Sequence, residues 1–256
     1  MSSLFDLTDR VALITGSSRG IGHSLAIGLA EAGATIVLNG LDETRLQAAR
    51  ISLAERFGER RVFARAFDVV DESAVVIAVD SIEREAGPIG ILVSNAGIQH
   101  REPLLDVSLA DWRRVIDIDL TGAFVVGRTV AKRMVARGTG KIINICSIQT
   151  DLARPTIGPY TAAKGALRNL TRAMTAEWAS AGLQINGIAP GYIHTEMTQN
   201  LVDDEAFNTW IVGRTPARRW GTAGDIVGPA VWLSSGASEY VNGQVIFVDG
   251  GMSVVV

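Results

Sequence analysis

The sequence predicts a doubly wound α/β fold, in which a parallel sheet of about seven strands carries helices on both faces. Short apolar runs alternate with longer segments of helical period, and this order requires right-handed crossover connections between the strands. The runs are mainly apolar, as expected for strands that are covered on both faces. A glycine-rich turn, Thr15–Gly22, directly follows the first run and precedes a helical segment.

Each expected element rests on its own periodicity. The helical segments are best defined at Ile21–Ala32, Glu43–Phe57 and Glu72–Glu85, where apolar residues recur at helical spacing. Ligands of such sheets bind beyond the carboxyl ends of the strands, so the residues just after each strand are candidates for chemistry. The expected strands are Val11–Thr15, Thr35–Asn39, Val62–Phe67, Ile89–Ser94, Lys141–Cys146, Leu183–Ile188 and Gln244–Val248.

Composition indicates one enzyme-sized domain, residues 1–256, because no linker, repeat or charge run marks a boundary. The net charge of −3, from 24 basic and 27 acidic residues, gives no electrostatic case for nucleic acid or an anionic membrane surface. No apolar run reaches the ~18 residues of a membrane helix. The start, MSSLFDLTDR, has the features of neither a signal peptide nor an anchor.

A single cysteine, Cys146, excludes an internal disulfide and suits the reducing cytoplasm. Its place directly before Ser147 would allow a nucleophilic role. Its apolar run, I-I-N-I-C, favours a small core residue instead.

The turn T-G-S-S-R-G-I-G predicts a dinucleotide site. Gly16 permits a tight turn, Gly20 lets the backbone approach a pyrophosphate, and Gly22 allows close packing of the helix. The helix N-terminus then offers free N–H groups and a partial positive charge to the phosphates. The expected cofactor contacts in this turn are Gly16, Ser18, Arg19, Gly20, Ile21 and Gly22.

The second strand bears on the choice between NADP and NAD. An NAD site usually has a carboxylate at its end for the ribose 2′-hydroxyl, but the matching position here is Gly40. Asp42 comes too late and is expected to cap the helix from Glu43. Arg19 would match a 2′-phosphate, or else be a solvated loop charge, and Leu41 is not a second basic residue. NADP is favoured, with NAD as the alternative.

Two later strand ends suit the same cofactor. Asp68, before Val69, is placed to read an adenine amino group, or alternatively to cap the next helix. The small residues of Asn95-Ala96-Gly97 leave room for a ribose and a nicotinamide.

Tyr160 and Lys164, in Y-T-A-A-K, lie four residues apart and so on one helix face. This spacing sets a proton donor beside a positive charge. Taken alone, the spacing favours a half-buried tyrosine beside a surface lysine.

Together with TGSSRGIG, NAG, Ser147 and A-P-G-Y-I-H-T, this motif gives the chain a family signature: over essentially its whole length it resembles the short-chain dehydrogenase/reductases. The resemblance implies that Tyr160 is the general acid/base and that Lys164 stabilises its ionised form and holds the nicotinamide ribose. It implies that Ser147 hydrogen-bonds the substrate oxygen. The segment expected to close over the nicotinamide and phosphates contains Pro190, Gly191, Ile193 and Thr195.

Asp119, in D-L-T-G, departs from the family, which usually has asparagine there to shape the helix and hold a water for a proton relay to the lysine. Aspartate keeps the size, loses the amide donors and adds a potential charge. The relay could still run through the backbone carbonyl, so we expect an active enzyme.

Several stretches, among them N-A-G-I-Q-H-R and R-T-P-A-R-R-W-G, resemble the branch of the family that oxidises D-gluconate reversibly at C5. A sugar acid needs a cation and polar groups in its pocket. Arg101 is the first candidate for the carboxylate, with a solvated loop arginine as the alternative, and Gln149 for a hydroxyl. His100 and Arg154 are second candidates, and no metal is expected.

The resemblance also implies a small helical lid over the substrate at about residues 198–219 and a homotetramer. Rival functions are a 3-oxoacyl thioester reductase or a polyol dehydrogenase of the same fold, and a non-catalytic dinucleotide-binding protein. The intact Ser147, Tyr160 and Lys164 oppose the last.

Overall fold

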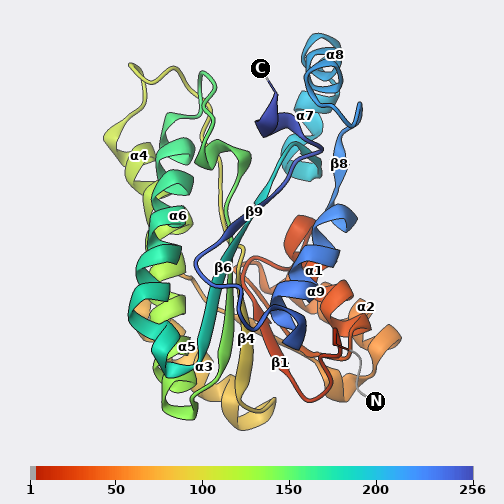
Figure 1. Ribbon diagram of the computed structural model, residues 1–256, viewed down its shortest axis with the longest axis vertical. Coiled ribbons are helices and arrows are strands. Elements are labelled where there is room, and N and C mark those ends of the chain that lie inside the picture. Colours follow the sequence, from red (N-terminus) through yellow and green to blue (C-terminus); the bar gives the residue numbers. More distant parts are fainter. Residues whose placement is uncertain (1–3, 256) are drawn as a thin grey trace.

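A computed structural model describes residues 4–255 and contains the predicted sheet, seven parallel strands in the order β3-β2-β1-β4-β5-β6-β9 (Figure 1). Residues 1–3 of the segment predicted to carry no signal or anchor lie outside the described residues. Strand β4 has the predicted bounds, and each of the other six differs from its prediction by one or two residues at one or both ends. The strands are β1 Val11–Ile14, β2 Thr35–Gly40, β3 Val62–Ala66, β4 Ile89–Ser94, β5 Gly140–Ile145, β6 Leu183–Pro190 and β9 Val245–Val248.

Helices cover both faces of the sheet, as predicted (Figure 1). Neighbouring residues of β1 show why its run is apolar throughout. Ile14 packs with the helices of one face and Leu13 with those of the other, and both side chains are fully buried. One face carries α1 Gly20–Glu31, α2 Glu43–Phe57 and α9 Val227–Ser234, and the other carries α3 Glu72–Glu85, α4 Leu109–Ile116, α5 Gly122–Arg137 and α6 Gly158–Trp178.

Side-chain caps fix where two of these helices begin. The Asp42 carboxylate accepts a hydrogen bond from the backbone N–H of Arg45 at 3.0 Å, which confirms the predicted cap of α2. The alternative that Asp68 caps the following helix is wrong. Asp71 caps α3 by accepting from the N–H of Ala74 at 3.0 Å, whereas the Asp68 carboxylate accepts from the N–H of Val70 at 3.1 Å in the turn before the helix.

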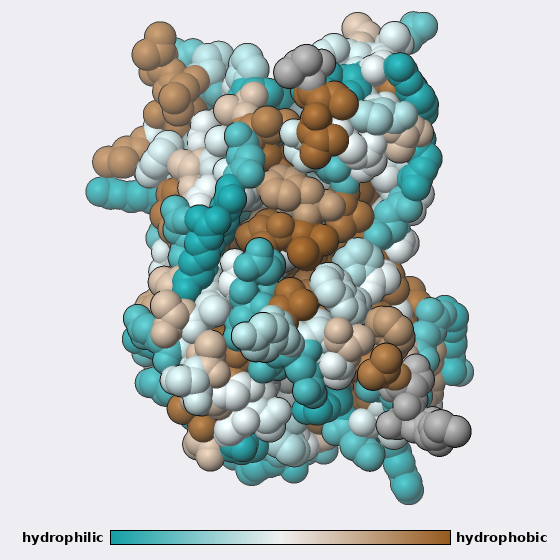
Figure 2. Space-filling view, viewed as in Figure 1, coloured by the Kyte–Doolittle hydropathy of each residue, from teal (hydrophilic) through white to brown (hydrophobic). Residues whose placement is uncertain are grey.

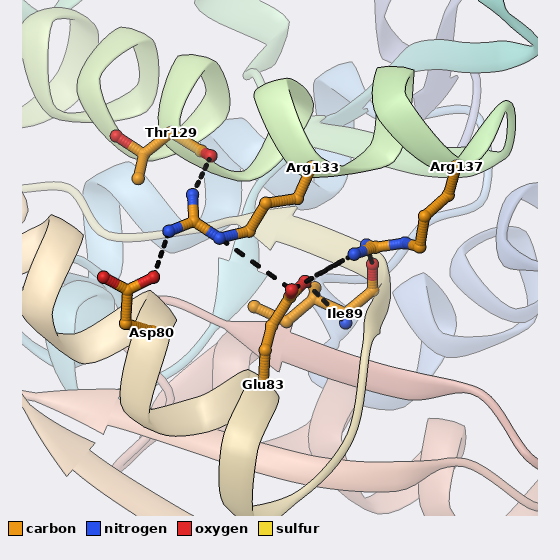
Figure 3. Close-up of polar contacts among 6 residues, drawn as sticks. All are labelled: Asp80, Glu83, Ile89, Thr129, Arg133 and Arg137. Atoms are coloured by element: carbon orange, nitrogen blue, oxygen red, sulfur yellow. Dashed lines mark hydrogen bonds and ion pairs between the residues drawn. The ribbon is translucent and has the colours of Figure 1, made fainter.

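Ion pairs join α3 to α5 on the outer surface (Figure 3). Arg137 approaches Glu83 at 2.9 Å and also donates to the carbonyl oxygen of Ile89 at 2.8 Å, which ties both helices to β4. Arg133 pairs with Asp80 and lies 3.8 Å from Glu83. These contacts lie away from the carboxyl ends of the strands. They therefore stabilise the packing of α3 and α5 and take no direct part in the candidate site.

The predicted lid segment, residues 198–219, contains two short helices beyond the carboxyl ends of the strands, α7 Gln199–Val202 and α8 Glu205–Arg214 (Figure 1). Beside them, β7 Ile193–His194 pairs with β8 Gly221–Thr222. Phe207 of α8 packs edge-on against Tyr192, with ring centroids 5.7 Å apart. Between residues 4 and 255, no helix is long and apolar enough to cross a membrane.

Candidate active site

One cavity of ≈ 460 Å³ collects nearly all of the predicted site residues at the carboxyl edge of the sheet. It passes from the glycine-rich turn, past the ends of β4 and β5, to the segment after β6. Gly22, His100 and Arg101 are the predicted residues that do not line it, whereas Arg154, the other second candidate for the substrate, does. The predicted residues that do are Gly16, Ser18, Arg19, Gly20, Ile21, Asp68, Val69, Asn95, Ala96, Gly97, Asp119, Ser147, Gln149, Tyr160, Lys164, Pro190, Gly191, Ile193 and Thr195.

The glycine-rich turn fits a dinucleotide. Gly16 has φ +62° and lies so close to Ala96 that a Cβ would come within 2.8 Å of its Cα. Gly20 also has positive φ, but nothing lies within 4 Å of the place where its Cβ would be. Helix α1 has no side-chain cap and no acid in its first turn. Its N–H groups are therefore available to a pyrophosphate.

Two asparagines brace this turn. Asn39 accepts from the N–H of Gly16 at 3.2 Å and donates to the carbonyl of Phe67 at 3.0 Å. Asn95 donates from Nδ2 to the carbonyl oxygens of Thr15 and Gly16, both at 3.0 Å. Through these two hydrogen bonds, the side chain of Asn95 holds the backbone of the turn in place. Asn39 was not predicted, although a lone amide in an apolar strand was a possible signal.

The part of the cavity next to Gly40, where the adenosine is predicted to bind, is lined by two basic side chains, Arg19 and Arg45, and by the carboxylate of Asp42. Arg19 pairs with Glu196 at 2.8 Å, both side chains being largely exposed. Arg45 lines the cavity and has only a 3.9 Å approach to Asp42. Sequence reasoning missed Arg45, because it lies one helical turn past the strand end that was searched.

Ser147 and Tyr160 face the cavity with Lys164 behind them. The Oγ of Ser147 accepts from the N–H of Gln149 at 3.1 Å, which leaves its own proton for a ligand. Lys164 is only 3% exposed, so the surface-lysine alternative is wrong. Its Nζ lies 5.4 Å from the ring centroid of Tyr160. Thr150 ties the two segments together by donating to the carbonyl of Lys164 at 3.3 Å.

Asp119 forms a buried ion pair with Lys164, its Oδ2 lying 3.3 Å from Nζ. It sits in a π-helical turn, Asp117–Thr121, between α4 and α5, and its Oδ1 accepts from the N–H of Ile98 at 2.8 Å. Burial raises the pKa of Asp119, and Lys164 opposes that rise. Burial alone would lower the pKa of Lys164, but chiefly the Asp119 carboxylate raises it above its ordinary value.

Cys146 is buried, and burial raises the pKa of its thiol to about 11. It packs with Leu167 and Ala189. A thiol so rarely ionised is a poor nucleophile, which agrees with the predicted core role.

The substrate end lies beyond Ser147. Gln149 is 6% exposed, and its Oε1 has no hydrogen-bond partner. Arg154 lines the cavity near Tyr192, whereas Arg101 lies outside the lining and contacts the segment that contains α7. His100 approaches Glu102 at 2.9 Å.

Comparison with known proteins agrees with this geometry. A family model described as Enoyl-(Acyl carrier protein) reductase matches residues 16–253. The chain belongs to this family of short-chain dehydrogenase/reductases and is a nicotinamide-dependent oxidoreductase, as the motifs predicted.

Among its relatives, a gluconate 5-dehydrogenase of Gluconobacter oxydans (strain 621H) is 53% identical over 98% of this chain and 97% of its own. A 2-dehydro-3-deoxy-D-gluconate 5-dehydrogenase of Formosa agariphila is 48% identical over 97% of this chain and 94% of its own. The crystal structure of a gluconate 5-dehydrogenase from Burkholderia cenocepacia J2315 in complex with NADP and tartrate has a TM-score of 0.95. It is 51% identical and covers 99% of this chain and 98% of its own.

Proposed function

We propose that the protein catalyses the reversible oxidation of D-gluconate at C5 to 5-dehydro-D-gluconate with NADP as the cofactor. One observation carries this proposal. A single cavity joins the dinucleotide turn and the Ser147–Tyr160 pair to a polar wall that holds the unpartnered oxygen of Gln149 and the guanidinium of Arg154. Such a wall suits a substrate with several hydroxyls and a carboxylate. The 53% identity to a gluconate 5-dehydrogenase supports the same substrate.

Ser147, Tyr160 and Lys164 each have a separate role in the reaction. When bound, the nicotinamide supplies the hydride acceptor for oxidation and the donor for reduction. Ser147 donates its hydroxyl proton to the C5 oxygen and orients it, because its own lone pair is engaged by the N–H of Gln149. Tyr160 takes the proton of the C5 hydroxyl during oxidation and returns it during reduction. The buried ammonium of Lys164 favours the ionised phenol and is fixed by the carbonyl of Ile145 at 2.9 Å.

NADP is preferred on electrostatic grounds. The position that would hold a ribose-binding carboxylate is Gly40, so no side chain at that position repels a 2′-phosphate, and the nearby Asp42 carboxylate is engaged as the cap of α2. Arg19 and Arg45 both line the cavity and supply positive charge. A relative 51% identical to this chain was crystallised with NADP, which supports the choice.

The chain works as one domain in which residues 198–219 form a lid over the substrate. Helices α7 and α8 stand beside the cavity mouth, where Met197 and Leu201 join its lining. The aromatic side chains of the segment pack among themselves and against Tyr192, with Trp210 and Tyr192 centroids 6.4 Å apart.

The working assembly is a homotetramer in the cytoplasm. Strand β9 is the edge of the sheet, and its four apolar residues are all partly exposed. Figure 2 shows hydrophobic surface across the middle of the face on which β9 lies. Exposed edges of this kind are commonly covered by a partner. The single buried thiol suits a reducing compartment. Light scattering of the purified protein gives the mass that tests the assembly.

An assay of nicotinamide absorbance tests the function. D-Gluconate, 2-dehydro-3-deoxy-D-gluconate, D-glucitol and a 3-oxoacyl thioester are compared, each in its reacting direction with NADP and with NAD. The expected result is the highest kcat/KM with D-gluconate and NADP. The second acid is included because of the 48% identity to an enzyme named for it. A higher kcat/KM with any other substrate, or no turnover at all, contradicts the proposal.

A further inference from the structure

An ion pair joins the glycine-rich turn to the segment that leads into the lid. Nη1 of Arg19 lies 2.8 Å from Oε2 of Glu196, which is 177 residues further along the chain, and both residues line the cavity. The two side chains are 56% and 69% exposed. Exposed pairs of this kind are weak, so a ligand of matching charge can replace either partner.

Arg19 lies close to the place expected for a 2′-phosphate. Gly40 stands where an NAD site has its ribose-binding carboxylate, and a Cβ on Gly40 would come 3.2 Å from Oγ of Ser18. The glycine-rich turn thus meets the end of β2 one residue before Arg19. Within residues 4–255, the guanidinium makes no hydrogen bond except the one to Glu196. The group that would bind a 2′-phosphate is therefore already bound to an anion.

Glu196 differs from the other carboxylates that line the cavity. Asp42 and Asp68 accept hydrogen bonds from backbone N–H groups of their own turns, and Asp119 is buried. The carboxylate of Glu196 is exposed, and in the part of the chain that the structure describes its one hydrogen-bond partner is Arg19. Of these acids, Glu196 is the one whose only engagement is with a cofactor-binding side chain.

The backbone that carries Glu196 is held without the ion pair. Oγ1 of Thr198 accepts from the N–H of Thr195 at 2.9 Å and donates to the carbonyl of Ile193 at 2.7 Å. Glu196 begins the 3₁₀ turn that these bonds enclose, Glu196–Thr198, directly before α7. Loss of the ion pair therefore leaves the turn in place, and the effect of the carboxylate on a ligand is electrostatic.

We infer that Glu196 is a specificity-determining residue for the cofactor, because it competes with the 2′-phosphate of NADP for Arg19. This inference rests on the proposed use of NADP. In the cofactor-free protein the carboxylate neutralises the guanidinium, and NADP has to displace it. NAD carries a hydroxyl in place of the 2′-phosphate and leaves the pair intact. Glu196 thus reduces the preference for NADP that Arg19 and Arg45 create.

Calorimetric titration of the wild type, E196Q and E205Q with NADP and with NAD tests the inference. E196Q should lower the Kd for NADP about 5-fold and leave the Kd for NAD unchanged. E205Q, the matched control, removes an exposed acid of α8 that does not line the cavity, and it should change neither Kd. Adenosine 2′,5′-bisphosphate and adenosine 5′-monophosphate, which differ only in the 2′-phosphate, should repeat the pattern without the nicotinamide.

A second comparison tests the competition itself. If Glu196 acts through Arg19, the gain in NADP affinity from E196Q should be smaller when R19A is also present. Higher salt should reduce the gain as well, because it screens both charges. A gain of the same size in the R19A background shows that Glu196 does not act through Arg19, and it overturns the inference.

The unfolding temperature of each variant shows whether the fold is intact. In a folded E196Q, a Kd for NADP that is unchanged or higher, or an equal fall in Kd for NADP and NAD, overturns the inference and leaves the proposed function standing. A wild-type protein that binds NADP no more tightly than NAD overturns the proposed choice of cofactor and the inference with it.

Discussion

The Oδ2 of Asp119 lies 3.3 Å from the Nζ of Lys164, and the two side chains are 1% and 3% exposed. The ammonium also donates to the carbonyl of Ile145 at 2.9 Å, and the carboxylate accepts from the N–H of Ile98 at 2.8 Å. Lys164 is therefore fixed on two sides. The charge that acts on Tyr160 is that of an ion pair, which is weaker than the charge of a lone lysine.

This relationship predicts that Asp119→Asn remains active and changes the pH dependence. Without the carboxylate, the positive charge of the Lys164 ammonium beside the phenol is no longer offset by a neighbouring negative charge. The acid limb of kcat/KM for D-gluconate oxidation should move down by about 1 pH unit. Initial rates measured across the range from pH 5 to about 10 give the limb.

The opposite outcome has a clear cause. Burial lowers the pKa of Lys164, and chiefly the Asp119 carboxylate raises it again. If the carboxylate of Asp119 is what keeps Lys164 protonated, Asp119→Asn lets the lysine lose its proton. The acid limb of kcat/KM then moves to higher pH. That result, or an inactive variant, would contradict the prediction.

Tyr160→Phe should nearly abolish turnover without loss of cofactor binding. The ring of Tyr160 stays near Lys164 in the variant, since the ring itself lies 5.4 Å from Nζ, but the proton acceptor is gone. General acid–base catalysis contributes about 10²–10⁴-fold, so kcat should fall by that factor. Titration with NADP, followed by fluorescence, should give an unchanged Kd. Undiminished rates would require a different acid/base.

Most residues of this site could be predicted from the sequence, because the apolar runs show where the strands end. Parallel strands carry their carboxyl ends to one edge, so Gly16, Asn95, Ser147 and Pro190 could be brought together from residue order alone. The motif spacing predicted Lys164 beside Tyr160. Helix caps such as Asp42 were equally readable, because they depend on neighbours three residues away.

Contacts between distant segments could not be read in this way. The family resemblance linked position 119 to Lys164 only through a water, and it gave no sign of a direct ion pair, because that contact depends on how the π-helical turn packs against α6. Arg101 was preferred over Arg154 because it lies just past the Asn95-Ala96-Gly97 loop. The sequence could not show that its side chain also contacts Asn200, almost a hundred residues along the chain.

Cofactor preference should depend on Arg45 as well as Arg19. Arg45→Ala should lower kcat/KM with NADP about 10-fold and leave NAD nearly unchanged, because only NADP carries the 2′-phosphate. Arg19→Ala should also lower kcat/KM with NADP, but by a smaller factor, because Arg19 is already paired with Glu196 and the substitution removes that competing pair as well. The ratio of kcat/KM for the two cofactors is the measurement. Equal losses with both cofactors would assign Arg45 a structural role.

The Cys146 thiol should resist alkylation in the folded protein. Burial raises its pKa from the ordinary 9.0 to about 11, so at pH 8 the thiolate is about 100-fold rarer than in an unfolded chain. Iodoacetamide should therefore modify the native protein at least that much more slowly than the protein in denaturant, as followed by mass spectrometry.

Because the folded pKa is the higher one, the thiol's contribution to stability is complete below about pH 9 and is lost as the pH rises toward 11. Cys146→Ala, which has no thiol, should lose less stability than wild type over that interval. Equal alkylation rates in the native and unfolded states would show that the thiol is open to reagents and to the substrate cavity.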